Sequence, residues 1–220
     1  MAASVVTRGA LLRAAATSGS MMALGDVLTQ TIQRRRHQQQ QQQRLAGGKK
    51  GGGDAATTAP LPPLDFSRTF RFALIGATLH GPFFCAGLAW LDRLFPGAPT
   101  PALVAKKVLT GQLVLFPTYT ATFLAYLRVL EGTPVAALPE RLASERGSLA
   151  QTITRGSIFW PCVNVVNFSV VPPGLRIFAM NCAGLAWNAY LSYATQEQQA
   201  AVAGAGAGAG TAALATTKRR

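Results

Sequence analysis

Charged residues are scarce in this chain, and acidic residues are the scarcest. Only 13% of the 220 residues are charged, about half the usual share for a soluble domain. Lys and Arg number 21 against 8 Asp and Glu, so the formal net charge is +13. A soluble protein normally covers its surface with charge, so an ordinary soluble domain is disfavoured. The positive excess instead suits nucleic acid or the anionic surface of a bilayer.

Residues that build metal centres and disulfide frameworks are also few. The chain has two histidines, His37 and His80, and three cysteines, Cys85, Cys162 and Cys182, without CxxC spacing. Neither a zinc site nor a disulfide framework can be assembled from this set. No GxSxG, HExxH, Walker or GxGxxG motif is present, and the acids are scattered. We therefore expect a protein that is not an enzyme and that has no metal and no cofactor.

The charged residues leave five long gaps between them. Each gap is 20 residues long and free of charge with His80 counted as neutral, except that the first contains Asp26. Twenty helical residues cover about 30 Å, the thickness of the hydrocarbon core of a bilayer. The sequence thus predicts an all-α fold, a polytopic transmembrane helix bundle, and the alternative is a soluble bundle of unusually buried helices. The gaps lie between Arg13 and Arg34, Arg71 and Asp92, Lys107 and Arg128, Arg155 and Arg176, and Arg176 and Glu197.

A proline pair separates the last two segments. Pro172, Pro173 and Gly174 precede Arg176, and a helix cannot continue through two prolines. The 16 residues from 156 to 171 cover about 24 Å as a helix, which is short for a full span. We therefore predict four spans plus one bent or partial segment, with five spans as the alternative. The helices of this bundle, residues 67–198, are expected at about 69–92, 106–128, 150–171 and 174–195.

Two segments of low complexity accompany the predicted spans. After a first segment of residues 1–33, residues 34–66 combine a run of three arginines, six consecutive glutamines, glycines and prolines. This composition cannot bury enough apolar area to offset its ordering entropy, so we expect a disordered linker. Residues 199–220 are expected to form a Gly/Ala tail, and residues 131–147 a polar connection. The N-terminal stretch carries arginines and no acid before Asp26, a composition similar to a mitochondrial presequence.

Polar side chains inside the apolar segments are the candidate functional residues. Lipid offers no hydrogen bonds, so these groups should face one another inside the bundle. Asp26 and Gln30 share one helical face, and Asn164 and Asn167 lie on one stripe. Arg176 is expected to anchor at the head-group level or to pair with Asp26. The full set of candidates is Asp26, Gln30, His80, Gln112, Asn164, Asn167 and Arg176.

Two roles are open for these residues. They either hold the helices together, each hydrogen bond contributing about 1 kcal/mol, or line a wet path for small solutes or ions. Asp26 favours the second role, because a carboxylate within a span costs at least about 2.5 kcal/mol and is rarely kept without a function. His80 can change its charge near neutral pH, although a lone histidine is more often a packing residue.

The stretch WPCVNVVNFSVVPPGLR, residues 160–176, resembles a family signature. Its W-P-x-x-N-x-x-N-F-x-x-V-P-x-x-x-R pattern is similar to that of the Mpv17/PMP22 family of small mitochondrial and peroxisomal membrane proteins. The blocks SGSMMALGDVLTQ, HGPFFCAGLAWLDRLFPG and WNAYLSY agree with the same family. KVLTGQLVLFP, from Lys107, matches the family pattern K-x-x-x-D-Q-x-x-x-x-P except that Gly111 stands where aspartate is usual.

The resemblance implies a four-span bundle in the mitochondrial inner membrane, with the peroxisomal membrane as the alternative. Family members are associated with channel activity and mitochondrial homeostasis, so the resemblance implies a permeability pathway for small solutes or metabolites. The competing hypothesis is a non-conducting scaffold whose polar residues only hold helices together. The expected partners are the lipid bilayer, further copies of the chain in a homo-oligomer and a small solute or ion, but no nucleic acid. The resemblance gives weight to Asp26, Gln30, Gln112, Trp160, Asn164, Asn167 and Arg176.

Overall fold

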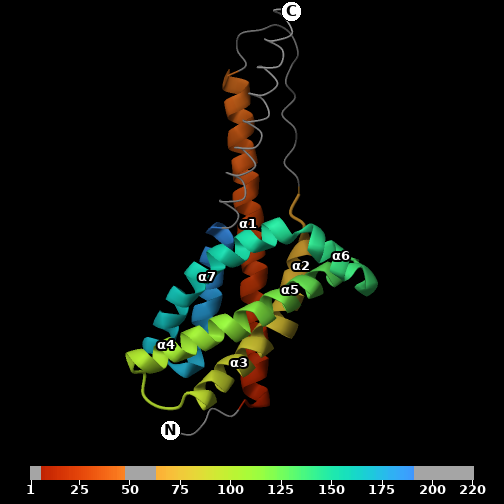
Figure 1. Ribbon diagram of the computed structural model, residues 1–220. Helices are drawn as coiled ribbons and strands as arrows, with labels where there is room; N and C mark the ends of the chain where they lie inside the picture. The colour runs from red at the N-terminus through yellow and green to blue at the C-terminus, as the bar shows by residue number, and fades with distance from the viewer. Residues whose placement is uncertain (1–5, 48–62, 191–220) are drawn as a thin grey trace, which may run out of the picture. The chain divides into compact units, whose positions relative to one another are not determined.

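The chain is helical in the part that the structure describes. This computed structural model describes residues 6–47 and 63–190, and no strand occurs among them. The predicted all-α class is therefore confirmed. The helices are α1 (Arg8–Gly47), α2 (Phe66–Ile75), α3 (Gly81–Leu94), α4 (Pro101–Thr110), α5 (Phe116–Leu130), α6 (Leu138–Ser144) and α7 (Arg146–Ser169), followed by helical residues 176–190 (Figure 1).

The chain divides into two compact units. Among the described residues, the first holds 6–27 and 65–185, and the second holds 28–47, 63–64 and 186–190. Within the second unit, the rings of Trp187 and Tyr190 lie 5.7 Å apart between centroids. The interactions described below belong to the first unit, which contains α2 to α7 and the beginning of α1.

Two long apolar helices run through the first unit. Helices α2 and α3 join through a π-helical turn, η1 (Gly76–His80), into one helix of 29 residues, Phe66–Leu94. Helices α4 and α5 join in the same way through η2 (Gly111–Leu115) into one of 30 residues, Pro101–Leu130 (Figure 1). By length and composition, these two helices are the ones within residues 6–47 and 63–190 that can cross a bilayer. The predicted count of four spans therefore stays a prediction.

The ends of the two long helices follow ordinary capping chemistry. The side chain of Asp65 accepts a hydrogen bond from the backbone N–H of Arg68 at 2.9 Å. Thr100 does the same for the N–H of Leu103 at 3.3 Å, in front of a proline at the first helical position. Between the helices, Gly97 has a φ of +124°, a left-handed conformation that favours glycine. The sequence thus specifies a turn between two long helices.

Each π-helical turn ends two residues before a proline. Pro82 and Pro117 lack an N–H, so each removes the ordinary bond to the carbonyl four residues earlier. The backbone compensates with a bond that reaches five residues back, from the N–H of Gly81 to the carbonyl of Gly76. The turn η2 repeats this arrangement before Pro117. Local adjustments of this kind keep proline-containing helices compatible with lipid, where unpaired backbone groups are costly.

Glycines let α1 approach α2 and α3 backbone to backbone. A Cβ atom added to Gly76 would lie 2.5 Å from the carbonyl oxygen of Ser18 and 2.8 Å from the Cα of Gly19. A Cβ atom at Gly81 would collide with the backbone carbonyl of Ala14. Small residues at helix contacts are typical of membrane bundles, because close packing replaces the hydrophobic effect there. The first unit therefore depends on glycine at these two positions.

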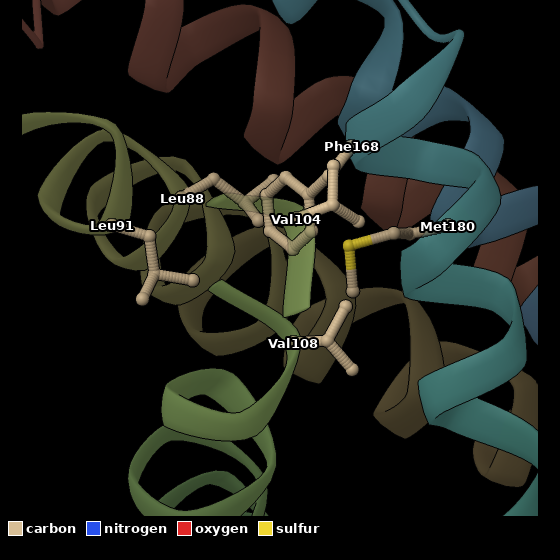
Figure 2. Close-up of a cluster of buried hydrophobic side chains, with 6 residues drawn as sticks. All are labelled: Leu88, Leu91, Val104, Val108, Phe168 and Met180. Atoms are coloured by element: carbon tan, nitrogen blue, oxygen red, sulfur yellow. The ribbon is translucent and has the colours of Figure 1, made fainter. Parts of the chain in front are cut away.

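An apolar cluster joins the helices near the turn between α3 and α4. Its six buried side chains come from α3, α4, α7 and the helical residues 176–190 (Figure 2). Leu91 and Phe168 are among its most deeply buried members, at 1% and 3% exposure. The cluster consists of Leu88, Leu91, Val104, Val108, Phe168 and Met180.

Large apolar side chains also lie on the outside of the first unit. Leu109 is 61% exposed and Leu113 is 74% exposed, both on the long helix Pro101–Leu130. Ile158 on α7 is 71% exposed. Exposed large apolar side chains of this kind suit a protein surrounded by hydrocarbon.

The predictions for the linker and for the break between the last two segments have different outcomes. Helix α1 continues through residues 34–47, which corrects the expectation of disorder there. Glutamine and arginine are good helix formers, and a helix already begun extends easily into such a run. The predicted break after α7 is observed, because α7 ends at Ser169 and Pro172 precedes the short 3-10 turn η4 (Pro173–Leu175). The polar connection of residues 131–147 contains η3 (Val135–Ala137) and α6. Linker residues 48–62 and the tail lie outside the described residues.

Candidate functional site

Asp26 is buried against the first turns of α2. Its exposure is 4%, and the guanidinium Nε of Arg68 lies 2.7 Å from its Oδ1. The hydroxyl of Thr69 donates to its Oδ2 at 2.7 Å. The carboxylate is therefore neutralised within the bundle by a partner that begins the next helix. A pairing of Asp26 with Arg176, one of the two alternatives for that arginine, is therefore wrong.

Arg176 instead belongs to a buried ionic cluster with Asp92 and Lys107. The Nη1 of Arg176 donates to both carboxylate oxygens of Asp92 at 2.9 Å, and the Nζ of Lys107 donates to Oδ1 at 2.6 Å. The side chains of both cations are only 9% exposed, whereas that of Asp92 is 20% exposed. We call these three residues the Asp92 cluster. It joins the end of α3, α4 and the beginning of the helical residues 176–190.

The Asp92 cluster rests on the apolar cluster through Phe168. The ring of Phe168 lies 5.2 Å from the guanidinium carbon of Arg176 and 5.8 Å from the Nζ of Lys107. Both contacts fall within the range of attraction between a cation and an aromatic face. Phe168 therefore offers some compensation for the burial of two positive charges around one carboxylate.

Asp92 and Lys107 are site residues that the sequence alone did not reveal. Both residues delimit charge-free gaps, and so does Arg176. Such positions suggest charges at the membrane interface. They do not reveal a contact, because the contacting residues lie 15 and 84 positions apart in the sequence. Their positions at the ends of apolar segments were the available signal.

His80 lies at the end of the π-helical turn η1, among aromatic rings. Its Nδ1 is 2.6 Å from the hydroxyl of Tyr119 on α5. The rings of Phe84 and Tyr119 lie 4.8 Å and 5.2 Å from the imidazole. The other ring nitrogen, Nε2, is buried and has no hydrogen-bond partner among the described residues. His80 is thus a polar group that the surrounding side chains satisfy only in part.

The predicted amide residues fall into different situations. Gln112, in η2, donates to the hydroxyl of Ser157 at 3.1 Å, which links the long helix Pro101–Leu130 to α7. Asn167 is 1% exposed, and neither atom of its amide has a partner within the described part of the chain. Asn164 is half-buried on the same helix. Gln30 lies in the part of α1 that belongs to the second unit, whereas the other candidates belong to the first.

Asn181 makes the deepest contact between amide and hydroxyl. Its Nδ2 donates to the Oγ of Ser18 at 3.0 Å, and both residues are buried. This bond connects α1 to the helical residues 176–190, across 163 positions of sequence. It shows the use of polar residues as contacts between helices.

The described residues offer no ready metal site. Within residues 6–47 and 63–190, no group of three or more His, Cys, Asp or Glu residues is placed to hold a metal ion. The expectation that the chain is not an enzyme stays a prediction.

Comparison with known proteins gives a consistent set of relatives. Protein sym1 of Aspergillus oryzae is 30% identical over 128 residues, 58% of this chain and 70% of the relative. Protein sym-1 of Neurospora crassa is 32% identical over 131 residues, 59% of this chain and 72% of the relative. The mitochondrial inner membrane protein Mpv17 of Bos taurus is 29% identical over 177 residues, 80% of this chain and 85% of the relative. No solved structure matches the chain.

These relatives confirm the location expected from the sequence, the mitochondrial inner membrane. The model of the Mpv17 / PMP22 family matches residues 128–192, which include the WPCVNVVNFSVVPPGLR stretch. Two relatives at 30% identity or above are covered over more than two thirds of their length. The chain is a membrane protein that belongs to the Mpv17/PMP22 family.

Proposed function

We propose that the chain forms a permeation pathway for small solutes or metabolites across the mitochondrial inner membrane. Such a pathway would contribute to mitochondrial homeostasis. The observation that carries the proposal is the presence of buried polar atoms without protein partners among the described residues of the first unit. These atoms are the amide of Asn167 and the Nε2 of His80.

A polar group buried without a partner costs about 1–3 kcal/mol, so most proteins pair such groups. In a protein surrounded by hydrocarbon, no lipid atom can replace the missing partner. Water inside the bundle is the partner that remains, and a hydrated interior is what a solute pathway requires. Asn167 on α7 and His80 on η1 would then be lining residues of that interior.

A bundle of few helices leaves little room for a wide pore. The pathway would therefore open in a minor conformation or lie within a homo-oligomer, surrounded by the lipid bilayer. The π-helical turns η1 and η2 support a conformational opening, because such turns often mark functional positions in helices.

A second candidate function has its own support. The bonds of Asn181 to Ser18 and of Gln112 to Ser157 use polar residues as contacts between helices. A chain that uses all its polar residues in this way would be a non-conducting membrane scaffold. The two candidates differ in whether Asn167 contacts water.

Conductance of the purified full chain in planar bilayers tests the proposal. We expect stepwise currents from the native chain and a clearly smaller conductance from Asn167→Leu, which removes the amide. The matched control is Val165→Leu, a change on the same helix at a position that is 45% exposed on the outside. Silence of the native chain across solutes and voltages would overturn the proposal and favour the scaffold. Equal conductance of all three chains would remove Asn167 from the pathway.

A further inference from the structure

The Asp92 cluster carries more positive charge than it can neutralise. Its two cations, Lys107 and Arg176, share a single carboxylate, which leaves a surplus of one positive charge. A second ionic network in the same unit is balanced, since Arg128 and Arg141 face Glu131 and Glu145. A buried surplus charge is costly, so its neutralisation by a bound anion would contribute to the binding free energy of that anion.

The free hydrogen-bonding capacity of the cluster consists of donors. Both oxygens of Asp92 accept bonds, and the Nε of Arg176 donates to the carbonyl of Val171 at 3.3 Å. The Nη2 of Arg176 has no partner among the described residues, and the Nζ of Lys107 makes one bond out of the three it can donate. A guanidinium edge beside an ammonium group matches the geometry of a phosphate group.

The cluster lies where phosphate groups are available. Asp92 is two residues before the end of α3, and the connection that follows joins two helices able to cross a bilayer. Such a connection lies at the membrane surface. Lys107 lies about 9 Å along α4 from its first residue, Pro101. Its long side chain reaches back to Asp92. The 20% exposure of Asp92 leaves the cluster open on one side.

We propose that the Asp92 cluster is a binding site for a phosphate group with one negative charge. An anionic lipid head group and free inorganic phosphate both present this chemistry. Basic pockets between membrane helices bind anionic head groups in this way. The site does not depend on whether the chain conducts solutes.

Gly111 offers a variant that alters the charge without dismantling the cluster. It lies one helical turn after Lys107 and therefore on the same face. Its backbone angles are helical, and an added Cβ atom would meet only the Cδ1 of Leu91, at 3.6 Å, an ordinary contact. Gly111→Asp places an acid beside Lys107 and removes the surplus charge. Gly111→Asn has the same shape without the charge and is the matched control.

Native mass spectrometry of the full chain in detergent tests whether a lipid head group supplies the phosphate. It compares the retention of anionic phosphatidylglycerol with that of zwitterionic phosphatidylcholine. Thermal stabilisation by inorganic phosphate against chloride at equal ionic strength tests the free ion. We expect the native chain and Gly111→Asn to retain phosphatidylglycerol, or to be stabilised by phosphate. Gly111→Asp should bind roughly tenfold more weakly, the factor that a hydrogen bond to a charged group contributes. Retention without stabilisation identifies the lipid head group, and stabilisation without retention identifies the free ion.

A charge change outside the cluster distinguishes binding at the cluster from a general effect of the protein's net charge. Arg128→Gln removes one positive charge from the balanced network and should leave phosphate binding unchanged. Equal binding by the native chain and both Gly111 variants would overturn the proposal. It would also be overturned if Arg128→Gln weakened binding as much as Gly111→Asp, or if the native chain preferred neither phosphatidylglycerol nor phosphate.

Discussion

Replacing Asp92 with asparagine should destabilise the protein strongly, because it removes the carboxylate that two buried cations share. The side chains of Lys107 and Arg176 are each 9% exposed, so water compensates only a small part of the lost charge. Asparagine has nearly the same shape as aspartate. The loss therefore reports the charge rather than the packing.

The expected loss of unfolding free energy for Asp92→Asn is about 3 kcal/mol, the lower end of the range for breaking a buried ion pair. Glu145→Gln provides a matched comparison. Glu145 also pairs with two cations, and its side chain is 19% exposed against 20% for Asp92. Its partner Arg141 is 54% exposed, however, so this loss should be about 1 kcal/mol or less.

The assay is unfolding of the purified chain in mixed micelles with increasing dodecyl sulfate, followed by circular dichroism at the helix signal. A double variant, Asp92→Asn with Lys107→Met, should recover part of the loss, since it removes one of the two unpaired cations. Equal losses for Asp92→Asn and Glu145→Gln would refute the reasoning, because burial of the cations would then have no effect. A stable Asp92→Asn chain would refute it as well.

Three further changes have expected outcomes in the same unfolding assay. Gly76→Ala should cost about 1–3 kcal/mol, because the added methyl meets the backbone of Ser18, whereas Gly184→Ala, with open space around it, should cost nothing. Asn181→Ala should cost about 1 kcal/mol through the lost bond to Ser18, and an unchanged midpoint would show that this bond contributes nothing. Asn167→Leu should leave stability unchanged or higher, since the amide gives up no bond to a described residue, and a loss above about 1 kcal/mol would show either that the amide has a structural partner or that the larger side chain does not fit.

The positions of the two long helices could be predicted from the sequence because a membrane imposes a simple requirement on length and charge. The gaps from Arg71 to Asp92 and from Lys107 to Arg128 fall inside the observed helices. The break after α7 was predictable for an equally local reason, the pair of prolines at 172 and 173. Both features depend on neighbouring residues alone.

The Asp92 cluster could not be predicted, because it depends on how three helices meet. Arg176 reaches Asp92 across 84 positions, and nothing in either local sequence indicates the other. The pairing of Asp26 with Arg68 was missed for the same reason. The helical state of residues 34–47 was missed for a different one, because their low complexity suggested disorder although those residues favour helix.

The central claim is that hydrocarbon surrounds the exposed apolar faces of the two long helices. A spin label at position 113 in reconstituted vesicles tests this directly, because Leu113 is 74% exposed. The three native cysteines are first replaced by alanine, and a label at Glu140, on the short polar helix α6, serves as the comparison. We predict that oxygen relaxes the label at 113 strongly while a water-soluble nickel complex hardly reaches it, with the opposite result at 140. If the nickel complex relaxed both labels equally, the outer face of this helix would be in water and the claim would be contradicted.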